Sequence, residues 1–194
     1  MNTGIIILII VVVLGGWLVG LYNKLVKLSV RVEEAWADID VQLKRRYDLI
    51  PNLVKTVKGY AAHEKETLEA VLKARAAATA INIDAGNVTP EQMSAFAGAQ
   101  SGLSGALGKL MAVAEQYPDL KANENFLELQ REITDTENKI QASRRFYNGV
   151  VRDMNTMVLS FPTNIFTGMF GFSKKEFFNL DDKPEEKKPV KVSF

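Results

Sequence analysis

Residues 4–22 read GIIILIIVVVLGGWLVGLY, and no charged side chain interrupts them. At about 1.5 Å of rise per residue, a single helix of this length reaches across the ~30 Å hydrocarbon core of a bilayer. Trp17 and Tyr22 lie near its C-terminal end, where aromatic rings favour the membrane–water interface. A cleavable signal peptide would carry basic residues before the run and a small-residue cleavage site after it, and neither is found. The sequence therefore predicts a transmembrane anchor over residues 1–23.

The charges beside the anchor predict its orientation. No Lys or Arg precedes the run, whereas Lys24, Lys27 and Arg31 follow it closely. By the positive-inside rule we expect a single-pass protein with its N-terminus outside the cell membrane and the rest of the chain in the cytoplasm. Acidic residues at 33–40 dilute the basic stretch, and long domains translocate regardless of flanking charge, so the opposite topology stays open.

The composition narrows the class of protein. Lys and Arg number 24 and Asp and Glu number 23, giving a net charge of +1, and the two signs are interspersed. Binding to a nucleic-acid backbone needs a basic face, so we expect no nucleic-acid partner. The absence of Cys excludes disulfides, thiolate metal sites and a cysteine nucleophile.

After the anchor, apolar side chains recur at steps of three and four residues, the spacing that lines one face of a helix. In the first stretch these are Leu25, Leu28, Val32, Ala35, Ile39 and Leu43. We expect this helix to continue from the anchor and to end at residues 46–51, because the residue before Pro51 avoids the α region and Asp48 can cap a new first turn. The second helix is then expected to run to about Ile83.

The start of the third helix has the clearest local signal in the chain. After a predicted turn at residues 84–87, Thr89 stands as an N-cap, with Pro90 at the first helical position and Gln92 at the capping-box position. Apolar residues then repeat every seven positions until Pro118 closes the segment.

The fourth predicted helix, from about 122 to 160, keeps the same heptad repeat. Short connections favour antiparallel neighbours. Residues 24–160 therefore predict an all-α, up-and-down helical bundle of four long helices, or of three if Pro51 only kinks a continuous helix.

Four glycines stand inside the third predicted helix: Gly98, Gly102, Gly105 and Gly108. Each costs a helix up to about 1 kcal/mol relative to alanine. Because they fall within a sustained apolar repeat, we interpret them as sites of close helix contact, with a locally loose helix as the alternative.

Three segments of the chain resemble the LemA family of bacterial membrane proteins. They are residues 22–64 (YNKLVKLSVRVEEAWADIDVQLKRRYDLIPNLVKTVKGYAAHE), residues 143–148 (SRRFYN) and residues 161–172 (FPTNIFTGMFGF). The resemblance extends from the anchor to about Phe178. It implies one N-terminal anchor, a helical cytoplasmic bundle and kinship with proteins of magnetosome membranes. It brings no catalytic residue and no settled biochemical role.

The residues give no sign of catalysis. His63 lacks the second histidine of a helical zinc motif, because that position is Thr67. Acidic and basic residues share the first helix, a mixture typical of a solvated face with i,i+4 pairs: Glu33, Glu34, Asp38, Asp40, Lys44, Arg45 and Arg46. No nucleophile elbow or nucleotide fingerprint occurs. We therefore expect no catalytic residue, cofactor or metal, and a protein that is not an enzyme.

Two other features point to membrane and assembly. Gly16 and Gly20 form a GxxxG pattern that lets transmembrane helices approach closely, although such glycines are also simply tolerated in membrane helices. Residues 161–178 combine aromatic, methionine and lysine side chains, as membrane-interfacial segments do. The candidates there are Phe166, Met169, Phe170, Phe172, Lys174 and Lys175. Packing of this segment against the base of the bundle is the alternative. Residues 179–194 have the composition of a disordered tail.

Together these patterns favour a non-enzymatic, membrane-anchored scaffold. Such a protein would contact membrane lipid, form homo-oligomers through its heptad faces and organise or shape the cell membrane. The alternative is a monomeric adaptor that presents the bundle to a membrane-protein partner, such as a membrane protease or an envelope-stress component.

Overall fold

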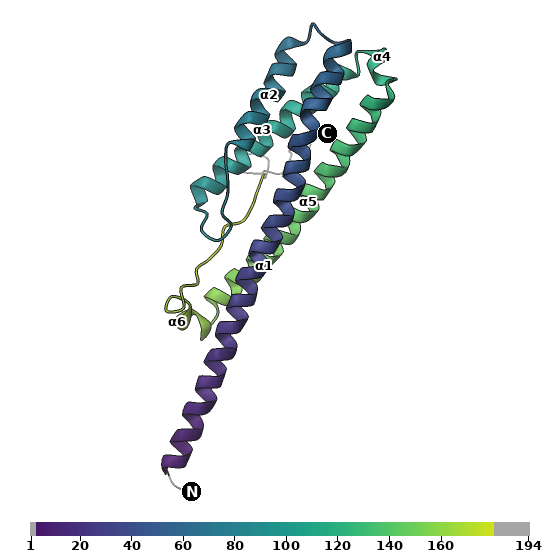
Figure 1. The fold of residues 1–194 in the computed structure, drawn as a ribbon. Coiled ribbons are helices and arrows are strands. Elements are labelled where there is room, and N and C mark those ends of the chain that lie inside the picture. The colour runs from purple at the N-terminus through teal and green to yellow at the C-terminus, as the bar shows by residue number, and fades with distance from the viewer. Residues whose placement is uncertain (1–2, 181–194) are drawn as a thin grey trace, which may run out of the picture.

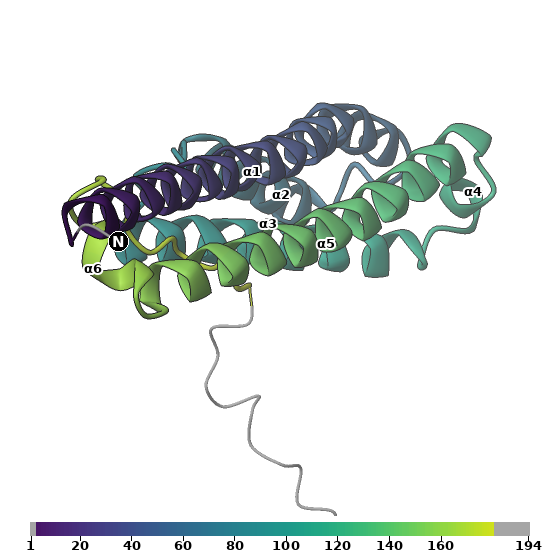
Figure 2. The same cartoon turned by 90° about the horizontal axis from the view of Figure 1, so that it is seen from below.

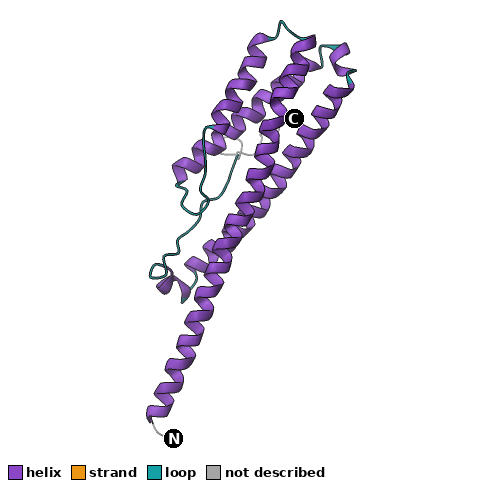
Figure 3. Cartoon of the chain, in the orientation of Figure 1, coloured by secondary structure: helices purple, strands orange, loops and turns teal. Residues whose placement is uncertain are grey.

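Helices are the only regular elements in residues 3–180, the part of the chain that the computed structural model describes (Figure 3). They are α1 (Thr3–Tyr60), α2 (Lys65–Thr79), α3 (Pro90–Ala114), α4 (Pro118–Lys121), α5 (Glu124–Leu159) and α6 (Thr163–Thr167).

 The all-α prediction is confirmed. Of these helices, α5 begins at Glu124 and ends at Leu159, close to the predicted limits of 122 and 160. Apart from residues 179–180, the predicted disordered tail lies outside the described residues.

The bundle is built on the pairing of α1 with α5, which lie side by side (Figure 1). The shorter helices α2 and α3 pack on each other and cover the end of the bundle that is far from the N-terminus, and the chain direction alternates through α1, α2, α3 and α5. The N-terminal part of α1 projects past the other long helices (Figure 1), and the view from below shows α6 beside this end of α1 (Figure 2). The predicted up-and-down bundle is therefore present, and α1 joins it directly to the predicted anchor.

Two apolar clusters make up the interior. The cluster nearer the anchor, here called the base core, includes Leu25, Val32, Trp36, Ile39, Phe96, Tyr147, Met154 and Phe178. The second, the far core, includes Ile50, Leu53, Val57, Val71, Leu103, Leu110, Leu120 and Phe126. The predicted inward positions of α1, α3 and α5 are nearly all found in these two clusters, because the heptad spacing places them on one face of each helix.

A polar layer centred on Arg46 lies between the two cores. Arg46 is only 1% exposed, and its guanidinium donates to Glu137 Oε1 at 2.6 Å and to Ser104 Oγ at 3.1 Å. It also donates to Gln100, whose side-chain amide donates in turn to the Tyr47 hydroxyl at 2.6 Å. The prediction that Arg46 belongs to a solvated face with i,i+4 partners is therefore wrong. A buried guanidinium needs polar partners from other helices, and α3 and α5 supply them.

The predicted helix boundary at residues 46–51 is also wrong, because α1 continues through Pro51 to Tyr60. Proline has no N–H, so it leaves the carbonyl four residues earlier without its helical partner. That carbonyl belongs to Tyr47, and Arg75 Nε on α2 donates to it at 2.8 Å. Pro51 itself lies on the exposed face of α1. A side chain from the neighbouring helix thus replaces the missing bond, and the turn to α2 falls at residues 61–64.

The capping box that opens α3 is confirmed. Gln92 N donates to the Thr89 hydroxyl at 3.2 Å, and Thr89 N donates to Gln92 Oε1 at 2.9 Å. The turn at residues 84–87 is also present, closed by a bond from Asn87 N to the carbonyl of Asp84 at 3.0 Å.

The glycines of α3 do not mediate close contact within the molecule, so that interpretation is wrong. No atom lies within 4 Å of the position that a Cβ would take at Gly98, Gly102, Gly105 or Gly108. The helix is nevertheless continuous from Pro90 to Ala114. The heptad residues hold α3 in place, while its glycines line the opposite, exposed side.

Candidate membrane interface

The N-terminal part of α1 is the one helix among the described residues that is long and apolar enough to cross a membrane. Its large side chains are exposed from Ile5 to Leu14. The core helix of a water-soluble protein would bury such side chains. This exposed apolar surface is what a membrane span presents to lipid.

The glycine pair of the span lies on a free surface. No atom lies within 4 Å of a Cβ built at Gly16 or Gly20. At about 100° per residue, these glycines point away from the side of α1 that carries Leu21 and Leu25, and both leucines are buried in the base core. The glycine face of the span is therefore turned away from the rest of the molecule.

Aromatic side chains of the predicted interfacial segment pack on the end of the span. Phe166 meets Trp17 edge-on, with ring centroids 5.9 Å apart. Tyr22 meets Phe170 at 5.4 Å and Phe172 at 5.9 Å, also edge-on. Edge-to-face pairs at such separations are favourable beyond the area that they bury. Segment 161–172 is thus placed beside the last turns of the apolar run.

Other side chains of the same segment face outward. Met169 is 78% exposed, Phe161 is 80% exposed and Ile165 is 59% exposed. Lys174 is exposed as well, whereas the ammonium of Lys175 donates to the carbonyl of Gly86 in the loop before α3. The segment therefore has one face that packs on the span and one face that is open.

A loop of residues 172–180, here called the strap, leads back from α6 along the bundle. Two asparagines of α5 hold its backbone through paired hydrogen bonds. Asn155 accepts from Lys175 N at 2.8 Å and donates to the Lys175 carbonyl at 2.9 Å. Asn148 does the same with Phe178, at 2.9 and 3.0 Å.

The spacing of these two asparagines explains the fit. Seven residues of helix rise about 10.5 Å, and three residues of extended chain cover about 10 Å, so both pairs can form at once. Sequence reasoning missed both asparagines. The available signal was a pair of asparagines seven residues apart, which places both on the same side of the apolar stripe of α5.

Phe178 anchors the strap in the base core. It is fully buried, with its ring centroid 5.3 Å from that of Phe96 and 5.8 Å from that of Trp36. Tyr147 packs on Trp36 and donates its hydroxyl to the carbonyl of Glu176 at 2.9 Å. Burial raises the pKa of the Tyr147 phenol, and the nearby Glu176 carboxylate raises it further. The strap thus joins α1, α3 and α5 at the base of the bundle.

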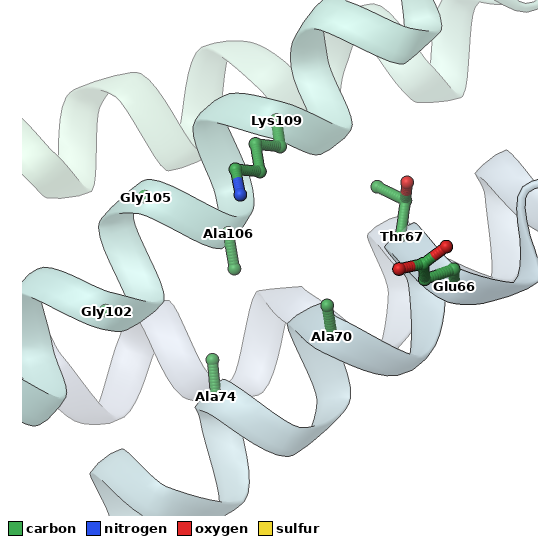
Figure 4. A pocket seen from close by; sticks show the side chains of 8 residues that line it. All are labelled: Glu66, Thr67, Ala70, Ala74, Gly102, Gly105, Ala106 and Lys109. Atoms are coloured by element: carbon green, nitrogen blue, oxygen red, sulfur yellow. The ribbon is translucent and has the colours of Figure 1, made fainter.

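An open groove of about 420 Å³ lies between α2 and α3 on another side of the molecule (Figure 4). It exists because its walls carry small side chains, among them Ala70, Ala74, Gly102 and Gly105. Glu66, Thr67 and Lys109 are its only residues with polar side chains.

The remaining candidates for chemistry lie apart from one another. His63 is in the exposed turn between α1 and α2, far along α1 from the span. The acidic side chains at positions 33, 34, 38 and 40 are exposed, as predicted for a solvated face. Burial of part of Asp40 raises the pKa of its carboxyl. Within residues 3–180 no three His, Asp or Glu side chains gather as a metal site would require.

Known proteins resemble this chain over most of its length. The magnetosome protein MamQ 2 of Paramagnetospirillum magneticum is 27% identical over 190 residues, which cover 87% of this chain and 68% of that protein. MamQ of Magnetospirillum gryphiswaldense is 25% identical with the same coverage. Protein LemA of Metamycoplasma hominis is 30% identical over 146 residues, covering 75% of this chain and 63% of that protein. None of these names states an enzymatic activity.

The sequence pattern of the LemA family matches residues 35–194, which is most of the chain and includes most of the bundle, α6 and the strap. The resemblance that the sequence itself suggested is therefore confirmed. With its exposed apolar helix and its helical bundle, the chain is a membrane-anchored helical protein that belongs to the LemA family.

Proposed function

We propose that this protein is a non-enzymatic, membrane-anchored scaffold whose copies associate through the glycine face of the span. One observation carries the proposal: Gly16 and Gly20 lie one helical turn apart on a surface that the rest of the molecule leaves free. In lipid, helices gain little from apolar burial and associate where small residues let their backbones approach closely. A second copy of the same span is the simplest partner for such a face, because a two-fold contact uses the same patch twice.

The continuous helix α1 supports a role in organising the membrane. Its 58 residues correspond to a rod about 87 Å long, and the bond from Arg75 preserves it where Pro51 would weaken it. Contact between two spans would therefore fix the distance between two bundles. The names of the MamQ relatives place those proteins with magnetosomes, which agrees with work at a membrane.

Cysteine cross-linking in native membranes tests this contact. The chain has no cysteine, so Gly16→Cys and Gly20→Cys each supply a single thiol. We expect oxidation to give cross-linked dimers at both positions and far fewer at Leu14→Cys, which lies around the helix axis by about 160° from Gly16 and about 120° from Gly20. Equal cross-linking at all three positions, or none, would contradict a glycine-face contact.

Bulky residues provide the complementary test. Gly16→Leu together with Gly20→Leu should hold the spans apart and reduce the mass of the detergent-extracted protein. Gly15→Leu is the matched control: it also replaces a glycine with no neighbour within 4 Å, but it lies off the proposed contact face. An unchanged mass in the double variant would count against the contact.

We also propose that the bundle lies in the cytoplasm, since Lys24, Lys27 and Arg31 follow the span. Ser101 is exposed on α3, so Ser101→Cys reports the location of the bundle. A membrane-impermeant thiol reagent should label it only after the cells are opened. Labelling of this thiol in intact cells would show that the bundle lies outside the cytoplasm and would overturn the proposed topology.

A further inference from the structure

The chain from the end of α5 to the start of the strap has an unusual composition. Residues 154–173 contain no charged side chain, although they include a short helix at the surface. Four large apolar side chains of this segment are exposed within eleven residues: Leu159, Phe161, Ile165 and Met169. Such a concentration of exposed apolar side chains in one short segment is typical of an interaction site.

The depth of this segment is fixed by the span. Phe166 packs on Trp17, and Phe170 and Phe172 pack on Tyr22. Trp17 and Tyr22 end the apolar run, just before Lys24. A segment held beside these residues lies where a bilayer changes from acyl chains to headgroups.

The segment cannot cross the membrane. Its helix α6 has five residues, and both of its ends are tied to the bundle, one through α5 and the other through the two hydrogen bonds between Asn155 and Lys175. In the hydrocarbon core, a non-helical backbone would lack hydrogen-bond partners. Its reach is therefore limited to the boundary region of one leaflet.

We propose that residues 159–171, here called the α6 foot, insert into the leaflet on the bundle side of the membrane. Leu159, Phe161, Ile165 and Met169 contact the acyl chains next to the headgroups, and Lys174 lies within the layer of lipid phosphates. The inference rests on the membrane anchoring of the proposed function and not on self-association. Span and foot together hold the bundle at a fixed height and tilt above the membrane. The foot also increases the area that the protein occupies in one leaflet, and in that leaflet only.

We favour lipid over a protein partner because the foot lies next to the membrane span. The foot packs on Trp17 and Tyr22, at the end of the exposed apolar run of the span, so the lipid around the span also reaches the foot. A foot exposed to water would leave these four large apolar side chains unburied, which costs hydrophobic free energy. Partial burial in the leaflet recovers part of this free energy.

Fluorescence quenching of the full chain in proteoliposomes tests the proposal. Ile165→Cys and, separately, Met169→Cys would carry an environment-sensitive nitrobenzoxadiazole label in vesicles of phosphatidylethanolamine and phosphatidylglycerol. We expect quenching by lipids brominated near the headgroup and protection from aqueous iodide. The control is Val41→Cys, a position on the bundle part of α1 that is 63% exposed, where iodide should quench and brominated lipids should not.

The outcomes separate the two proposals. Protection from iodide without quenching by brominated lipids would show that protein covers the foot, and strong iodide quenching at both positions would show that water does. Either result overturns the inference. Repeating the measurement in the Gly16→Leu and Gly20→Leu background should give the same depth, because insertion of the foot does not depend on association of the spans.

Discussion

Replacing Phe178 by alanine should release the strap while the helices stay folded. Removing a fully buried phenylalanine ring costs about 3–5 kcal/mol, and this ring packs against both Trp36 and Phe96 in the base core. The other bonds that hold the strap contribute about 0.5–1.5 kcal/mol each. They compete with about 1–2 kcal/mol of backbone entropy for every residue that the strap keeps ordered. Without the ring we therefore expect local opening.

Hydrogen exchange of the full-length protein in mild detergent measures this opening. The amides of Lys175 and Phe178 donate to Asn155 and Asn148, so they report directly on the strap. A loss of about 3 kcal/mol corresponds to roughly a hundredfold faster exchange, because each 1.4 kcal/mol is tenfold. Amides in the middle of α5 should keep their protection.

The neighbouring phenylalanine provides a matched control. Phe177 is 41% exposed, so Phe177→Ala removes the same side chain from the same strap with little loss of burial. We expect its effect on exchange to be several times smaller than that of Phe178→Ala. Equal effects of the two variants, or full protection of both amides in Phe178→Ala, would refute the assignment of Phe178 as the anchor.

Two further predictions concern the interior. Glu137→Ala should lower the free energy of unfolding by about 1–3 kcal/mol, because it leaves the buried Arg46 guanidinium without its carboxylate while water still reaches the site. In the same chemical denaturation series, Glu132→Ala should lower it by less than about 1 kcal/mol, since the ion pair between Glu132 and Arg45 is exposed. The Tyr147 phenol has a raised pKa in the folded protein. Above about pH 10 the phenol therefore loses its proton in the unfolded chain while it keeps it in the folded protein, and the free energy of unfolding falls as pH rises. In Tyr147→Phe that alkaline decline, followed by thermal unfolding, should be weaker, and an unchanged decline would show that other groups cause it.

The sequence predicted those features that depend on local patterns. Heptad spacing identified the buried faces of α3 and α5, and the capping box at Thr89 identified where α3 begins. Both signals lie within a few residues of the structure that they specify. The apolar run of residues 4–22 is equally local, and it led directly to the exposed helix that is the anchor.

The errors arose where a distant partner changes the local preference. Pro51 ends a helix in isolation, but Arg75 supplies the bond that it removes. Arg46 is typical of a solvated face until Gln100 and Glu137 approach it from other helices. Packing of the segment against the base of the bundle was one of the two alternatives, and Phe178 follows it. The hydrogen bonds that hold the strap were missed, because Asn155 and Asn148 lie 20 and 30 residues before their partners in the chain.

The glycines of α3 show a different limit of sequence reasoning. Their apolar surroundings suggested close packing, but the heptad face packs while the glycines remain exposed. In contrast, the glycine pair of the span lies on a surface that lipid or a second span must cover. The same residue type therefore supports an assembly proposal in one helix and none in the other.

The mass of the full-length protein extracted in mild detergent, measured by light scattering with the detergent contribution subtracted, tests the scaffold proposal most directly. One chain has a mass of 21.6 kDa. The account predicts dimers or larger assemblies that revert toward this mass when Gly16 and Gly20 are replaced by leucine. A uniform 21.6 kDa monomer in the unmodified protein would contradict self-association and favour an adaptor that works as a single copy.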